Sequence, residues 1–126
     1  MCDVRTVLII EDDDDLRRMF RTSLAFAGFR VLEAADGYSA LHRLDDAMPD
    51  AIVLDLDLPL VNGHVIRAEL AASAKMRHIP IIVVTGTRID TMTPRVACLL
   101  HKPVSPEDLV LTVRRCLASP TGPAGS

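Results

Sequence analysis

The sequence predicts an α/β protein in which a parallel sheet carries helices on both faces. Short runs of Val, Ile and Leu alternate along the chain with segments of helical spacing. Apolar runs of this kind are typical of strands that are buried on both faces. Because the loops between the segments are short, parallel pairing with helical crossovers is the favoured arrangement. The expected strands are residues 7–10, 29–34, 51–54, 81–84 and 96–100.

The first expected helix covers residues 14–27, where apolar residues recur at helical spacing. Gly28 follows it, in the position just beyond a helix end where glycine is common. Any of three consecutive aspartates could cap the N-terminus, because each carboxylate can accept from the first backbone amides. We assign this role to Asp14 and Asp15 and leave Asp13 open.

The last expected helix has the clearest beginning. Ser105 is suited to the N-cap, Pro106 to the first helical position, and two acidic residues follow them. Its buried stripe is expected to consist of Leu109, Val113 and Leu117. Two other helices are expected between the strands, over residues 39–46 and 63–72.

The composition indicates one domain. The chain has 126 residues, of which 49% are hydrophobic and 25% are charged, and this length suits a single core. We expect the domain to span residues 1–118, and the Pro, Gly and Ser-rich residues 119–126 to form a disordered tail or linker.

Several classes of protein are disfavoured. No apolar stretch is long enough to cross a membrane, and a formal net charge of −3 argues against binding nucleic acid. The N-terminus lacks the pattern of a signal peptide, and the three cysteines lack metal-ligand spacing. The sequence therefore predicts a cytoplasmic protein with free thiols.

Polar residues that could bind a ligand or take part in a reaction lie at the ends of four expected strands. In a parallel sheet these ends share one edge, which is where ligands bind in such folds. Several carboxylates at one edge would repel one another and raise their pKa values unless a cation joined them. Oxygen ligands without His or Cys favour Mg²⁺. The residues concerned are Glu11, Asp12, Asp55, Asp57, Thr85 and Lys102.

A carboxylate that lies between Mg²⁺ and a lysine is suited to receive a phosphoryl group. Asp55 is the expected nucleophile, because it ends the middle strand, while Lys102 and Thr85 would stabilise charge on the phosphoryl oxygens. Glu11 and Asp12 are the expected metal ligands. Each residue alone has an ordinary explanation, but together they agree on one site. The four histidines share no ligand spacing and are expected at the surface.

Four motifs stand in order along the chain: residues 8–13 (LIIEDD), 52–59 (IVLDLDLP) with Gly63, 83–86 (VVTG) and 102–103 (KP). Their order and spacing closely resemble the receiver domain of two-component response regulators, over about residues 6–117. The resemblance implies a doubly wound, flavodoxin-like sheet of five parallel strands in the order 2-1-3-4-5.

The resemblance also implies a function. Asp55 would accept a phosphoryl group from a phosphohistidine on a sensor histidine kinase or a histidine phosphotransfer protein. Thr85 would follow that group and Lys102 would pair with it. Such a domain is a switch whose surface a partner reads, and not an enzyme with a separate substrate. The implied ligands of Mg²⁺ are Glu11, Asp12, Asp55 and the backbone carbonyl of Asp57.

Two features depart from the family pattern. Leu99 stands three residues before Lys102, at the switch position where receivers usually carry Tyr or Phe. The crossover and its helix must come from residues 86–95, a segment that is rich in Thr and ends in Pro and Arg. We therefore expect the fourth helix to be short or absent.

Two alternative functions stay open. A receiver-like scaffold that works without phosphorylation fits Leu99 and the short crossover, although the complete set of site residues opposes it. The residues around Asp55 and Asp57 also resemble the nucleophile motif of haloacid-dehalogenase-like phosphatases, but Pro59 and the preceding acidic pair depart from it. Mg²⁺-dependent binding of a phosphoryl mimic would favour the phosphoacceptor, whereas turnover of a phosphoester would favour the phosphatase.

Overall fold

The computed structural model describes residues 4–56, 63–74, 76–86 and 98–118, and it confirms the predicted α/β fold. Its strands form one parallel sheet of order β2-β1-β3-β4-β5. The strands are β1 (Thr6–Ile10), β2 (Arg30–Ala34), β3 (Ala51–Asp55), β4 (Ile81–Thr85) and β5 (Cys98–His101). The helices are α1 (Asp14–Phe26), α2 (Gly37–Asp46), α3 (Gly63–Ala72) and α4 (Pro106–Ala118).

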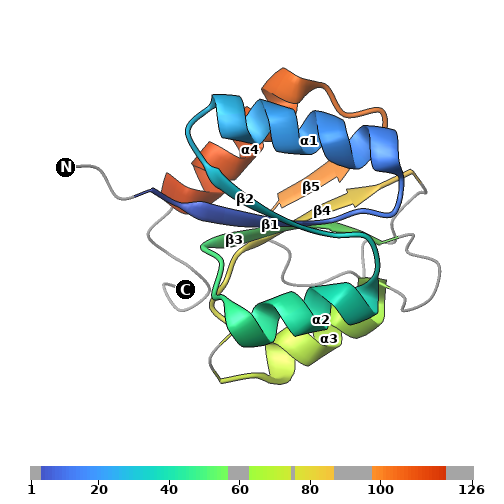
Figure 1. The fold of residues 1–126 in the computed structure, drawn as a ribbon, viewed down its shortest axis with the longest axis vertical. Coiled ribbons are helices and arrows are strands. Elements are labelled where there is room, and N and C mark those ends of the chain that lie inside the picture. Colours follow the sequence, from blue (N-terminus) through green and yellow to red (C-terminus); the bar gives the residue numbers. More distant parts are fainter. Residues whose placement is uncertain (1–3, 57–62, 75, 87–97, 119–126) are drawn as a thin grey trace.

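The sheet is the middle layer of three (Figure 1). Helices α1 and α4 cover one of its faces, and α2 and α3 cover the other. Strand β3 lies in the middle of the sheet and pairs with β1 on one side and β4 on the other. Residues at the C-terminal end of β3 are therefore flanked by the ends of both neighbouring strands.

Side chains alternate between the two faces along β1. Val7 and Ile9 pack against α1 and α4, whereas the intervening Leu8 and Ile10 pack against α2 and α3. All four are fully buried, which explains why the strand is apolar without alternation. By the same period of two, Glu11 continues the row of Val7 and Ile9.

The N-terminus of α1 corrects one prediction. The N-cap is Asp13, whose Oδ1 accepts a hydrogen bond from the backbone amide of Leu16 at 2.9 Å. Asp13 has the extended backbone of an N-cap, with φ −75° and ψ 119°. Asp14 and Asp15 lie within the first turn, where they complement the positive end of the helix dipole without capping it.

Two other predicted helix ends agree with the structure, whereas α2 begins at Gly37, two residues before its predicted start, because Asp36 is its N-cap. Gly28 follows α1 with a φ of 100°, a backbone conformation that glycine adopts readily. Ahead of α4, the Ser105 hydroxyl accepts from the backbone amide of Asp108 at 3.1 Å. Both ends are therefore set by the residues from which they were predicted.

The buried stripe of α4 is confirmed at Leu109 and Val113 but not at Leu117, which is only partly buried. Cys116 is buried instead. With 3.6 residues per turn, positions three and four after Val113 lie at the two margins of one stripe, and spacing alone does not choose between them.

Cys98 and Cys116 are free thiols. Burial, together with a hydrogen bond with Cys98, raises the pKa of the Cys116 thiol to about 12. A neutral thiol in apolar surroundings packs as a small hydrophobic group. The two described cysteines therefore agree with the predicted free thiols.

Three expectations lie outside the described residues. They concern the crossover helix within residues 86–95, of which only Gly86 is described, the tail at residues 119–126, and the backbone carbonyl of Asp57. Of the helices within the described ranges, none combines the length and apolar character needed to cross a membrane.

We expect Phe20→Ala to lower the free energy of unfolding by about 3–5 kcal/mol, because it leaves a cavity in the core between α1 and the sheet. Phe20 is fully buried, whereas Phe26 on the same helix is 95% exposed. The matched control Phe26→Ala should change the free energy by no more than about 0.5 kcal/mol. Urea denaturation followed by circular dichroism measures both, and similar losses in the two variants would contradict this packing.

The free energy of unfolding should fall as the pH rises from 9.0, the ordinary pKa of the thiol, towards 12. The folded state keeps the Cys116 proton to a higher pH than the unfolded state does, so the stabilisation is complete below the lower value and is lost above it. Urea denaturation across this range should show a steeper fall for the wild type than for Cys116→Ala. Equal slopes would show that the thiol is not protected by burial.

Candidate functional site

The carboxyl edge of the sheet collects the residues that the sequence analysis placed there. Glu11 and Asp12 follow β1 directly, and Glu11 extends the pairing with β2 because its amide donates to the carbonyl of Ala34 at 3.0 Å. Asp55 is the last residue of β3, and Thr85 is the last residue of β4.

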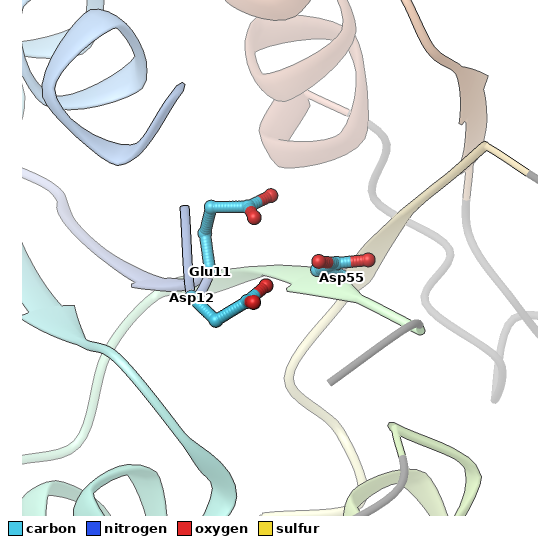
Figure 2. Close-up of side chains that lie close together, drawn as sticks. All are labelled: Glu11, Asp12 and Asp55. Carbon is cyan, nitrogen blue, oxygen red and sulfur yellow. The ribbon is translucent and has the colours of Figure 1, made fainter. Parts of the chain in front are cut away.

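Three carboxylates form a compact cluster at this edge. One oxygen each from Glu11, Asp12 and Asp55 lies within 4.8 Å of the other two. Figure 2 shows the Glu11 and Asp12 side chains, from the segment after β1, reaching towards Asp55 at the end of β3. Glu11 and Asp55 are each 1% exposed, whereas Asp12 faces solvent. The cluster therefore has two buried members and one exposed member.

Lys102 supplies the positive charge of the site. Its Nζ lies 3.4 Å from Oδ2 of Asp55 and 3.7 Å from Oε1 of Glu11. The lysine directly follows β5, and its backbone amide donates to the carbonyl of Thr85 at 2.9 Å. The Lys102–Pro103 peptide bond is cis. The side chain is 27% exposed, so the ammonium reaches the buried carboxylates from a partly hydrated position.

The two oxygens of Glu11 have different surroundings. Oε2 accepts from the backbone amide of Asp13 at 3.1 Å. Oε1 is buried and accepts no hydrogen bond within the part of the chain that the structure describes. Burial is the main cause that raises the pKa of Glu11 to about 8, and the nearby charge of Asp55 acts in the same direction, against the Asp13 amide and Lys102. One positive charge therefore does not fully compensate this cluster.

The cluster fits a hard divalent cation. Its donors are carboxylate oxygens from three residues, and one of them, Oε1 of Glu11, is buried with an unused acceptor. Mg²⁺ binds through one or two carboxylates together with water and phosphate oxygens. A site that is open on the side of the exposed Asp12 leaves room for those additional ligands.

Thr85 and Leu99 lie on the neighbouring strands. Thr85 is fully buried and pairs with His101 in the register between β4 and β5. Leu99 pairs with Val83, two residues before Thr85, and its side chain is 39% exposed. The fourth predicted Mg²⁺ ligand, the backbone carbonyl of Asp57, is outside the described residues.

The histidines agree with their prediction where they are described. His42, His78 and His101 are exposed, and the acidic cluster contains none of them. The side chain of His64 lies outside the description.

One residue that contacts this site, Arg17, was not predicted from the sequence. The guanidinium of Arg17, in α1, donates to the backbone carbonyl of Glu11 at 3.0 Å and to the carboxylate of Glu33 in β2 at 3.2 Å. Glu33 was assigned no role beyond its place in the expected strand 29–34. The sequence offers one indication of the Arg17–Glu33 pair: Arg17 lies one turn into the helix that directly follows the acidic residues.

A family model described as the response regulator receiver domain matches residues 7–114. A match over this much of the chain shows that the protein belongs to this family of signalling domains. The match does not point to the phosphatase family that residues 55–57 also resemble.

Curated relatives agree with this assignment. The chain is 30% identical to the regulatory protein AtoC of Escherichia coli over 122 residues, which cover 93% of this chain and 26% of that protein. It is 34% identical to the response regulator MprA of Mycobacterium sp. strain KMS over 118 residues, which cover 88% of this chain and 50% of that protein. The chain thus spans half or less of the length of these two relatives.

Solved structures show the same fold. The chemotaxis response regulator CheY4 of Vibrio cholerae has a TM-score of 0.84 and 27% identity, over 90% of this chain and 99% of that one. The receiver domain of the sensor histidine kinase PA1611 from Pseudomonas aeruginosa has a TM-score of 0.84 and 25% identity, over 93% of this chain and 100% of that one. That structure is described with a magnesium ion coordinated in its active site cleft.

We expect Mg²⁺ to raise the unfolding temperature of the wild-type chain, because a bound cation offsets the repulsion among the three carboxylates. Glu11→Gln and Asp12→Asn each remove one anionic ligand and should abolish most of the rise, as measured by differential scanning calorimetry. Without Mg²⁺, Glu11→Gln should be at least as stable as the wild type, since burial already disfavours the charged form of Glu11 and the amide is neutral at every pH.

The control is Asp15→Asn, which removes an exposed carboxylate from the first turn of α1, outside the cluster. It should respond to Mg²⁺ as the wild type does. An undiminished rise in Glu11→Gln, or a lost rise in Asp15→Asn, would contradict a site at the cluster.

Proposed function

We propose that this receiver domain accepts a phosphoryl group on Asp55. The observation that carries the proposal is the position of that carboxylate, buried at the end of the middle strand, 3.4 Å from the Lys102 ammonium and within the cluster of Glu11 and Asp12. A carboxylate is a competent nucleophile towards phosphorus when positive charge stabilises the oxygens of the group being transferred.

The donor in this proposal is a phosphohistidine. A carboxylate oxygen of Asp55 forms a bond to phosphorus while the bond from phosphorus to the histidine nitrogen breaks. The imidazole leaves with the electron pair of the broken bond and is neutralised by a proton from solvent. The products are an acyl phosphate on Asp55 and a free histidine, so no oxidant, reductant or nucleotide takes part in the step.

The residues proposed to hold Mg²⁺ are Glu11, Asp12, Asp55 and the backbone carbonyl of Asp57. The buried, unused acceptor of Glu11 and the oxygen-only donor set support the first three. When bound, the cation supplies positive charge that offsets the carboxylates and the incoming phosphoryl oxygens.

Two side chains are proposed to act on the transferred group. Lys102, which already lies between Asp55 and Glu11, would pair with a phosphoryl oxygen. The hydroxyl of Thr85, at the end of the adjacent strand, would follow the group and so report its presence. Leu99 occupies the switch position on β5 but has no polar group with which to bind a phosphoryl oxygen.

The proposed partner is a sensor histidine kinase or a histidine phosphotransfer protein. The net charge of −3 gives no support for nucleic acid as a partner. The free thiols of Cys98 and Cys116 suit a reducing, cytoplasmic compartment, where we place the exchange. Phosphorylation would bias the domain between two states that a partner distinguishes.

We expect incubation with acetyl phosphate and Mg²⁺ to add one phosphoryl group to the wild-type chain, as measured by intact-protein mass spectrometry. Asp55→Ala should lose the adduct because it removes the acceptor. Asp50→Asn is the matched control, since Asp50 precedes the same strand at the opposite edge of the sheet, where it accepts from the amide of Thr6. The adduct should form in this control as it does in the wild type. In both proteins it should fail to form when Mg²⁺ is chelated before acetyl phosphate is added.

Retention of the adduct in Asp55→Ala would contradict Asp55 as the acceptor. The absence of an adduct in the wild type, both with acetyl phosphate and with a phosphorylated histidine phosphotransfer protein, would favour a scaffold that works without phosphorylation. Continuous release of phosphate from a phosphoester would favour a phosphatase.

A further inference from the structure

We propose that Arg17 is a positioning residue for the metal site, because it holds the segment that carries Glu11 and Asp12 in the conformation that binds the cation. This inference rests on the proposed function, since it concerns the same Mg²⁺ site. It adds a residue to that site that contacts neither the cation nor the phosphoryl group.

Arg17 joins three parts of the chain through one guanidinium group. Nη1 donates to the backbone carbonyl of Glu11 at 3.0 Å, Nη2 to Oδ1 of Asp14 at 2.6 Å, and Nε to Oε1 of Glu33 at 3.2 Å. The side chain is half-buried, and its acceptors come from the segment after β1, from α1 and from β2. A planar group with three acceptors in different directions has little rotational freedom.

The contact with the Glu11 carbonyl completes the anchoring of that residue. The Glu11 amide donates to Ala34 in β2, and one carboxylate oxygen of Glu11 accepts from the amide of Asp13. With Arg17 on the carbonyl, both peptide groups of Glu11 are held. The direction in which its side chain leaves the backbone is therefore set, and Oε1 is left on the side of Asp55 and Lys102.

A second set of bonds extends the anchoring to the start of α1. The amide of Arg17 donates to the carbonyl of Asp13 at 2.8 Å, and the carboxylate of Asp13 accepts from the amide of Leu16. Asp12 lies between two residues that are both held in this way. The exposed carboxylate of Asp12 makes no hydrogen bond among the described residues, so its place in the cluster is set by the backbone on either side of it.

Arg21 provides a natural comparison. It donates to the other carboxylate oxygen of Glu33 at 3.3 Å, from the next turn of the same helix. In the described part of the chain it makes no hydrogen bond or ion pair with Glu11, Asp12 or Asp13. Removal of either arginine takes one positive charge from Glu33, but only removal of Arg17 frees the Glu11 carbonyl.

Charge and position predict opposite effects on metal affinity. A guanidinium close to the cluster repels a divalent cation, so its removal should tighten binding if charge were its only influence. If Arg17 holds the ligands in place, its removal should weaken binding in spite of the lost repulsion. The sign of the change in the dissociation constant therefore separates the two roles.

The test is isothermal titration calorimetry of Mg²⁺ into the metal-free full chain, at a temperature where every variant is folded. Arg17→Gln should raise the dissociation constant about tenfold, the lower range for residues that orient metal ligands. Arg21→Gln should leave it unchanged. Arg17→Lys keeps the charge but has one donor nitrogen in place of three, so its dissociation constant should fall between those of the wild type and Arg17→Gln.

Amide NMR spectra of the metal-free proteins give a second measurement. The Asp13 amide, which donates to Glu11, should shift in Arg17→Gln and keep its position in Arg21→Gln. An unchanged or lowered dissociation constant in Arg17→Gln would overturn the inference while the wild-type site stands. If Arg17→Gln does not fold, the same result in Arg17→Lys would overturn it. Failure of the wild type to bind Mg²⁺ would instead overturn the proposed function, and this inference with it.

Discussion

The burial of two neighbouring carboxylates, Glu11 and Asp55, is the constraint on which the rest of this site depends. Both lie at the carboxyl edge of an otherwise apolar sheet, and each has almost no exposed surface. Buried charges of one sign are tolerated only when they are neutralised or paired. Here the ammonium of Lys102 approaches both carboxylates, yet the pKa of Glu11 stays raised to about 8. The raised value means that the charged form of Glu11 remains disfavoured. A cation that takes the place of the Glu11 proton would stabilise the carboxylates and, together with Lys102, an anionic phosphoryl group.

The fold supplies the rigidity that such an arrangement requires. Strands β1 and β3 pair directly, and both are apolar on both faces up to the last residue before the acids. The carboxylates are therefore held by a packed sheet and cannot simply move apart to relieve their repulsion. The bonds around Glu11, including the one from Arg17, extend this rigidity from the strand into the segment that follows it. Without a cation, the buried carboxylates lower the stability of the folded chain, and binding of the cation restores it.

Local patterns in the sequence predicted the parallel sheet and the acidic cluster, whereas the strand order came only from the resemblance to receiver domains. Continuous apolar runs indicate strands buried on both faces, and parallel strands bring their carboxyl ends together whatever the details of packing. Predictions failed where the choice lay between adjacent residues. Asp13 caps α1 because its backbone alone is extended, and periodicity cannot distinguish it from Asp14. Arg17 was missed because its contact with Glu33 joins a helix to an edge strand, and such tertiary contacts leave no periodic signal.

The account makes one central claim, that Asp55 and the cluster around it bind a cation and a phosphoryl group together. A crystal structure of the chain with Mg²⁺ and a phosphoryl mimic tests this claim most directly. The predicted result is the mimic on the Asp55 carboxylate, Mg²⁺ bound by Asp55 and by Glu11 or Asp12, and the Lys102 ammonium against an outer atom of the mimic. A mimic bound elsewhere, or a mimic on Asp55 with no cation at the acidic cluster, would contradict it.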